Sequence, residues 1–194
     1  MSGEQVRTQG SRAGEIVGCA WDLARTVGIA GFSLRALARE VGIRQPSLYA
    51  HFESKHALYD AMFADGNRQL LARLDALVLP DDPRAALKVF MREFVAFALE
   101  DTARCYLIFQ RPIPGFEPST SAYGHAEQVM DRVVEVLRVA GVEDQADIDC
   151  FIAMVAGLIH TQLSNEPGGD RWSRHLERLT DLYLDDIHRR SRAS

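Results

Sequence analysis

Three side chains between residues 49 and 55 have the chemistry to bind phosphate. Tyr49, His51 and Lys55 carry a phenol, an imidazole and an ammonium group, and each can donate a hydrogen bond to a phosphate oxygen. Together they could imitate a catalytic cluster. However, they match no nucleophile motif and no spacing of metal-ligating histidines. The pattern therefore favours contact with a nucleic-acid backbone over catalysis.

The residues before this cluster predict two short helices joined by a sharp turn. Ser33 can cap the first helix by accepting a hydrogen bond from a free backbone N–H. Gly42 can take the positive φ that a tight reversal needs. Pro46 fits the first turn of the second helix, where its missing N–H has no intrahelical partner. The apolar residues of the first helix recur at helical spacing: Leu34, Leu37 and Val41.

The spacing of small and apolar residues across this turn is that of a helix-turn-helix. Ala38 lets the two helices approach, Gly42 makes the turn, and Leu48 fills the crossing. In such a motif the second helix enters the major groove of DNA. A plain helical corner without a nucleic-acid role has the same local spacing, so this alternative stays open on spacing alone.

Two long polar side chains at the start of the second helix are candidates for reading bases. Arg44 and Gln45 can each make a bidentate hydrogen-bonded contact with a base edge. His51 and Lys55 are expected to contact phosphates and so to act on all DNA sequences alike. The predicted DNA contacts are Ser33, Arg35, Arg44, Gln45, Pro46, Ser47, Tyr49, His51 and Lys55.

Residues 12–60 resemble the TetR family of bacterial transcriptional regulators. The matching words are Ser33-Leu34-Arg35-x-Leu37-Ala38, Val41-Gly42-Ile43 and Ser47-Leu48-Tyr49-x-His51-Phe52-x-Ser54-Lys55-x-x-Leu58. The resemblance implies a three-helix DNA-binding domain, a helical ligand-binding domain and a homodimer. One position departs from the pattern: Arg44 stands where the family usually has a capping serine.

The chain as a whole predicts an all-α fold of about nine helices in three segments. These are a flexible arm (1–11), a helix-turn-helix domain (12–54) and a ligand-binding and dimerisation domain (55–190). Gly66 interrupts the long helix expected at 55–78, either as a bend or as a tolerated glycine. The other helices expected outside the helix-turn-helix are 12–27, 83–100, 103–110, 119–140, 147–164 and 171–189.

Aromatic and methionine side chains of the second domain predict a pocket for a small, largely hydrophobic ligand. A filled core is the alternative for each of them. The proline-rich loop 111–118 could be a lid over the pocket or a staple onto the core. His160 could be a polar anchor. The predicted pocket residues are Phe90, Phe94, Phe97, Tyr106, Phe109, Phe116, Tyr123, Met130, Phe151, Met154 and His160.

The last two long helices carry more apolar residues than a single chain is expected to cover, which predicts a dimer seam. Two recognition helices on a twofold axis could read a palindromic operator in double-stranded DNA. The alternative is that both helices are internal. The predicted seam residues are Ile152, Val155, Ala156, Ile159, Leu163, Leu176, Leu179 and Tyr183.

Composition sets further limits. The net charge is −5, but residues 1–60 hold seven Lys/Arg against six Asp/Glu, and the rest hold 15 against 21. DNA affinity would therefore come from a few well-placed cations and from dimerisation. The three cysteines do not have the spacing of metal ligands, and we interpret them as reduced thiols. No secretory signal or membrane-length apolar run is evident, so we expect a cytoplasmic protein that contacts no membrane.

These patterns favour a one-component transcriptional repressor without cofactor, metal or enzymatic activity. Ligand binding would move the 55–78 helix and change the separation of the recognition helices. The alternative is a helical ligand carrier or enzyme in which the corner has no DNA role. An activator also fits, because the sign of regulation depends on where the operator lies.

Overall fold

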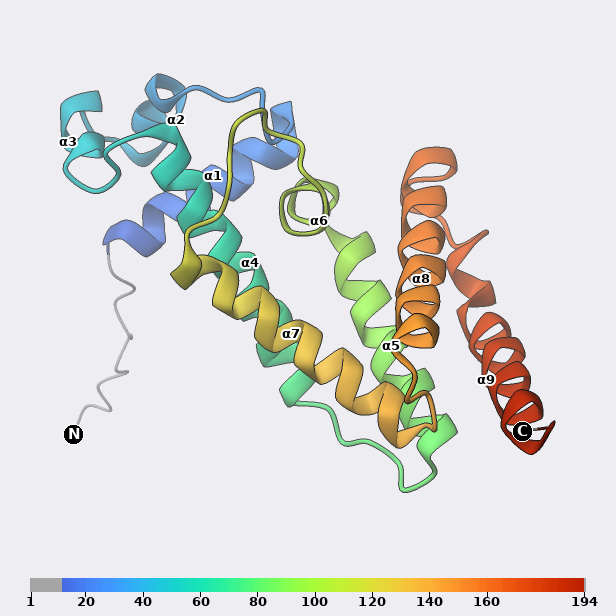
Figure 1. Cartoon of the computed structure of the whole chain (residues 1–194). Helices are drawn as coiled ribbons and strands as arrows, with labels where there is room; N and C mark the ends of the chain where they lie inside the picture. Colours follow the sequence, from blue (N-terminus) through green and yellow to red (C-terminus); the bar gives the residue numbers. More distant parts are fainter. Residues whose placement is uncertain (1–11, 194) are drawn as a thin grey trace, which may run out of the picture.

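The computed structural model describes residues 12–193, and the predicted arm at 1–11 lies outside them. Within this range the chain forms nine α-helices, a short 3₁₀ turn and no strand (Figure 1), which confirms the all-α prediction. The helices are α1 (Arg12–Val27), α2 (Leu34–Val41), α3 (Gln45–Tyr49), α4 (Lys55–Asp75), α5 (Pro83–Glu100), α6 (Thr102–Phe109), α7 (Thr120–Val139), α8 (Gln145–Asn165) and α9 (Leu176–Ala193).

Helix α4 runs from the small N-terminal helices into the rest of the molecule and contacts α1, α5, α6 and α7 (Figure 1). Helices α1, α2 and α3 gather at one end, and α4 packs most extensively against α7. Helix α6 contacts α1, α4 and α5. Helices α8 and α9 lie side by side at the opposite edge, against α5. The chain therefore places a compact three-helix unit at one end of a larger helical body.

Helix α4 is continuous through Gly66, so the glycine does not break the helix. A Cβ added at Gly66 would lie 2.9 Å from Ile108 Cγ2 and 3.5 Å from the Trp21 ring. Glycine is therefore needed here because α1 and α6 approach α4 closely. The helix ends at Asp75 rather than at residue 78.

The overpacked contact created by Gly66→Ala is expected to cost about 1–3 kcal/mol, because it forces neighbouring atoms to shift. This loss should outweigh the gain in helix propensity of about 1 kcal/mol. Gly18→Ala is the matched control: Gly18 is helical and exposed, and a Cβ there meets nothing within 4 Å. Urea unfolding should show Gly18→Ala stabilised and Gly66→Ala destabilised; stabilisation of both would contradict the packing argument.

The start of the last helix differs from the prediction. Residues Ser173–His175 form a 3₁₀ turn, and α9 begins only at Leu176. The cause is a contact from α8: Gln162 Oε1 accepts hydrogen bonds from the backbone N–H groups of Trp172 (2.8 Å) and Ser173 (3.2 Å). These N–H groups lie before the first turn of α9. The buried side chain that accepts their hydrogen bonds is 10 residues before Trp172.

Ion pairs attach α9 to α5. Four ion pairs join α5 to α9 through Arg84, Lys88 and Arg92, including Lys88 Nζ to Asp181 Oδ2 at 2.7 Å. The hydrogen bond from Lys88 is the main reason why the pKa of Asp181 lies below its ordinary value.

Among the described helices, α8 is long and apolar enough to cross a membrane by length and composition alone. A core helix has the same composition, and Ile148, Phe151 and Val155 of α8 are buried.

Candidate nucleic-acid interface and ligand cavity

The turn between α2 and α3 depends on the conformation of Gly42. Its φ is 73°, in the left-handed region that favours glycine. The Gly42 N–H donates to the Arg39 carbonyl (3.2 Å) and the Ile43 N–H to the Ala38 carbonyl (2.9 Å). This pair of bonds is the Schellman motif, which satisfies the last carbonyls of a helix. The predicted sharp turn is therefore present.

The starts of the two helices have the features expected from the sequence. Ser33 Oγ accepts from Ala36 N at 3.1 Å and caps α2. Arg44 stands at the N-cap of α3 without a side-chain hydrogen bond, and Pro46 lies in the first turn. Leu48 and Ala38 are buried between the two helices. The guanidinium of Arg44 is therefore not used for capping.

Seven of the nine predicted DNA-contact residues are exposed, and Gln45 and Lys55 are half-buried. Among the described residues neither Arg35 nor Arg44 forms an ion pair within the chain. Arg39, which the sequence analysis did not include, is also exposed one helical turn after Arg35 on α2 and is a further candidate. That i, i+4 spacing was the signal that could have found it. The exposed predicted residues are Ser33, Arg35, Arg44, Pro46, Ser47, Tyr49 and His51.

Lys55 has a structural partner as well as its predicted phosphate role. Its Nζ donates to the Ala30 carbonyl at 3.2 Å and lies 5.0 Å from the Phe32 ring centre and 5.3 Å from that of Tyr59. An ammonium over aromatic rings is held by their electron-rich faces. Lys55 therefore ties the start of α4 to the loop between α1 and α2.

A cavity of about 1000 Å³ lies among α4, α5, α6, α7 and α8. Most of its lining side chains are apolar. Its volume is at the upper end of the range for sites that bind drug-sized molecules. The predicted pocket residues that line it are Phe94, Phe109, Phe116, Tyr123, Met130, Phe151 and His160.

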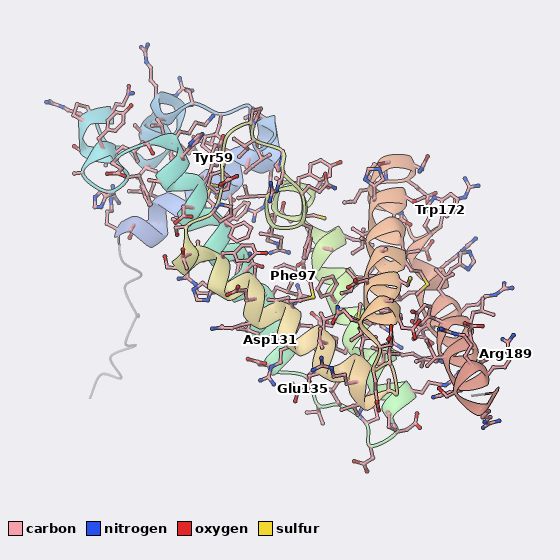
Figure 2. All side chains as sticks on the ribbon, in the orientation of Figure 1. Tyr59, Phe97, Asp131, Glu135, Trp172 and Arg189 are labelled. Atoms are coloured by element: carbon pink, nitrogen blue, oxygen red, sulfur yellow. The ribbon has the colours of Figure 1, made fainter. Side chains whose placement is uncertain are left out.

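Four predicted pocket residues lie elsewhere. Phe97 is fully buried in the interior (Figure 2), where its ring stacks on the guanidinium of Arg104, 3.6 Å from the ring centre. Phe90 lines a separate groove of about 270 Å³ between α5 and the end of α7. Tyr106 and Met154 are half-buried outside the cavity wall. Helical spacing identified apolar positions but not which of them face the cavity.

Among the lining residues that the sequence analysis did not assign to the cavity, two are buried and carry a polar group or a thiol. Asn67 of α4 is 2% exposed, and its Nδ2 donates to the Phe63 carbonyl at 2.9 Å. Cys105 of α6 is buried, and this burial raises the pKa of its thiol to about 12, so the thiol stays protonated at neutral pH. The signal for Asn67 was a polar residue at an apolar position of the predicted 55–78 helix.

The loop 111–118 packs on α4 and also borders the cavity, so the two interpretations of it are not exclusive. The Phe116 ring lies 5.8 Å from the Tyr59 ring and 5.9 Å from that of His56, between ring centres. Asp60 of α4 accepts hydrogen bonds from Ser119 N and Ser119 Oγ, just after the loop. Phe116 also lines the cavity.

Three contacts join the helices around the cavity to the N-terminal helices. Arg25 Nε of α1 donates to Asp101 Oδ2 at 2.7 Å, while Oδ1 of Asp101 caps α6. Trp21 Nε1 donates to Asp65 Oδ2 on α4 at 3.0 Å. Tyr59, near the start of α4 (Figure 2), donates through its hydroxyl to the Ile29 carbonyl at 3.0 Å. These hydrogen bonds connect α4 and the start of α6 to α1 and to the loop that follows it.

Half of the predicted seam residues are buried within the chain, and the other half are exposed or half-buried. Ile152, Val155, Ala156 and Ile159 line the cavity, and Leu163 and Leu176 are buried. Leu179 and Tyr183 are half-buried, and the Tyr183 hydroxyl donates to the Asp147 carbonyl at 2.5 Å. Burial is the main reason why the pKa of Tyr183 is raised to about 12. The exposed face of α8 instead carries Ala153, Ala156, Gly157 and His160.

The geometry defines a class of protein: a helix-turn-helix unit joined by one long helix to a helical body with a ligand-sized cavity. Residues 16–62 match the family described as bacterial regulatory proteins, tetR family. Over 97 residues the chain is 36% identical to the tetracycline repressor protein class A from transposon 1721 of Escherichia coli. That match covers 47% of this chain and 43% of the repressor.

Solved structures extend the likeness to the whole fold. The TetR-family regulator PfmR from Thermus thermophilus matches with a TM-score of 0.64 and 21% identity, over 90% of this chain and 97% of that one. BioQ, solved with its double-stranded DNA operator, matches with a TM-score of 0.61 and 20% identity, over 90% and 96%. Residues 16–62 therefore belong to the TetR family of bacterial regulatory proteins, and the chain as a whole shares the fold of these solved structures.

Proposed function

We propose that this protein is a one-component transcriptional repressor that binds palindromic operator DNA as a homodimer in the bacterial cytoplasm. A small, largely hydrophobic effector bound in the cavity releases it. One observation supports the proposal above the others. Arg44, Tyr49 and His51 are exposed at and just after the second helix of a pair joined by a turn at Gly42, and α4 connects this pair to a cavity of about 1000 Å³.

The DNA half of the proposal assigns different tasks to different side chains. Arg44 and Gln45 begin α3 and can form bidentate contacts with base edges in the major groove. Arg35, Tyr49 and His51 supply phosphate contacts, which fix position without reading sequence. BioQ, which shares the fold, was solved bound to its operator.

The effector half depends on differential affinity. A ligand shifts the equilibrium only as far as it binds one form better than the other. The cavity wall includes parts of α4 and α6, and both helices contact α1. A ligand that changes the position of either helix therefore changes the placement of α3 relative to its copy in the partner. The Arg25–Asp101 pair is one such contact, with an Asp101 side chain only 5% exposed.

Fluorescence anisotropy with labelled duplex from upstream of the protein's own gene tests the DNA role. We expect tight binding at low ionic strength that weakens steeply as salt is added, because phosphate contacts release counterions. An absence of binding to any duplex at low ionic strength would contradict the proposal and favour a ligand carrier or an enzyme without a DNA role.

The Arg44→Ala, Gln45→Ala double variant is expected to lose sequence preference, because each base contact contributes about 1–3 kcal/mol of discrimination. His51→Ala should instead weaken binding to all sequences similarly, because a phosphate contact carries no sequence information. Competition between operator and scrambled duplex measures both effects. Arg138→Ala with Gln128→Ala is the matched control, since both residues are exposed on α7. If the Arg44→Ala, Gln45→Ala variant keeps the wild-type preference for operator over scrambled duplex, these two residues do not contact the bases that set the preference.

A further inference from the structure

We propose that the cavity selects an apolar ligand that carries a neutral hydrogen-bond donor, a hydroxyl or N–H group, which binds to the side-chain oxygen of Asn67. This inference rests on the proposed ligand-binding function and adds the chemistry of the ligand. In this proposal, Asn67 is the residue that accepts the hydrogen bond from the ligand.

The orientation of the Asn67 amide follows from its one internal partner. Its Nδ2 donates to the Phe63 carbonyl at 2.9 Å. A carbonyl oxygen can only accept, so the nitrogen of the amide has to lie on that side. The side-chain oxygen, Oδ1, is therefore on the other side, as an acceptor.

Oδ1 of Asn67 has no hydrogen-bond partner among the described residues, although the residue is 2% exposed. The described side-chain atoms that are both fully enclosed and unpartnered are Arg104 Nε and Trp172 Nε1. Oδ1 is therefore not sealed in the protein, and the open space that Asn67 borders is the cavity. A buried acceptor of this kind is costly to leave unpaired when a ligand displaces water.

The surroundings of Asn67 favour a neutral donor over an ion. The charged residues on the cavity wall are Arg111, Glu117 and Glu127, and all three are exposed. A buried ammonium would find no carboxylate within the enclosed part of the wall, and burying an unpaired charge is strongly unfavourable. A carboxylate end would face the Asn67 oxygen with no donor of its own. The buried side chains around the site are apolar, among them Phe63, Met91 and Phe151.

Two matched probes test the proposal by isothermal titration calorimetry in the absence of DNA. 4-Phenylphenol and 4-methoxybiphenyl share the same apolar body and an oxygen at the same position, but only the phenol can donate. We expect the wild-type protein to bind the phenol about fivefold or more tightly than the ether. Biphenyl-4-carboxylate, which has no donor at neutral pH, should bind more weakly than the phenol. These three titrations need no variant.

The Asn67→Leu variant replaces the amide with an apolar group of similar size. In this variant we expect the preference for the phenol to be lost or reversed, with circular dichroism confirming the fold. Thr180→Val is the matched control: Thr180 is fully buried outside the cavity wall, and its hydroxyl donates to the Leu176 carbonyl four residues earlier, as Asn67 does to Phe63. Its preference should equal that of the wild type.

Three results would overturn the proposal: equal or tighter binding of the ether by the wild type, a preference that survives in Asn67→Leu, or no binding of either probe. None of them involves DNA. A protein that binds its operator but shows one of these results keeps the proposed DNA role and loses only this inference.

Discussion

Phe97→Ala is expected to lower the free energy of unfolding by about 3–5 kcal/mol while leaving the affinity for a cavity ligand unchanged. The Phe97 ring is fully buried. It stacks on Arg104 at 3.6 Å and lies 5.4 Å from the guanidinium carbon of Arg73. Alanine would leave a void and remove the stacking partner of a buried guanidinium, whereas the cavity wall would lose no residue.

Phe94→Ala is the informative comparison for this prediction. Phe94 lies one turn earlier on α5, is half-buried, and lines the cavity, where its ring packs against that of Phe109 at 5.3 Å. We expect a smaller loss of stability and weaker binding of 4-phenylphenol. Urea unfolding and calorimetry on both variants separate the roles. A ligand affinity that falls in Phe97→Ala, measured where that variant is fully folded, would place Phe97 on the cavity wall after all.

Local signals explain why most of the fold could be predicted from the sequence. Ser33 and Ser54 cap α2 and α4, and Gly42 takes the positive φ of the turn. Pro83 follows the capping Asp82 at the start of α5. Each of these features depends on residues within three or four positions along the chain, so the sequence contains the information without knowledge of the neighbours.

Features that depend on distant residues could not be predicted in the same way. The late start of α9 follows from Gln162 on α8, and the need for glycine at position 66 follows from Ile108 on α6. Arg25 and Asp101 are 76 residues apart, and no pattern relates them. For the cavity, seven of the predicted residues line the wall, but helical spacing alone cannot separate wall from core. The side facing the cavity is set by how α5, α6 and α8 are turned toward each other.

The same limit explains the seam prediction. Helix α8 is apolar nearly all round, so its sequence does not tell which side faces the protein. In the structure Ile152, Val155 and Ile159 line the cavity. Ala153, Ala156, Gly157 and His160 are exposed, and of these Ala156 and His160 also border the cavity. On α9, Leu182 is 57% exposed. We propose that the twofold partner packs on these exposed faces of α8 and α9.

Gly157→Arg is expected to break the dimer and lower operator affinity by roughly 100-fold or more, because the two recognition helices would no longer be linked. Gly157 is exposed, and a Cβ there meets nothing within 4 Å in the chain. An arginine should therefore extend into solvent without harming the fold of one chain, but it would place a charge and a long side chain in a close helix–helix contact. Sedimentation equilibrium and operator anisotropy measure the two effects together.

Gln128→Arg on α7 adds the same charge at an exposed helical position and is the matched control for Gly157→Arg. It should remain dimeric and bind the operator as the wild type does. If Gly157→Arg also remains dimeric, the exposed face of α8 is not the seam. If it becomes monomeric yet keeps full operator affinity, one copy of α3 suffices for recognition, and the argument from a palindromic operator fails. Because neither variant alters a residue of the helix-turn-helix, a loss of operator affinity that accompanies the loss of the dimer in Gly157→Arg would be attributed to the lost partner.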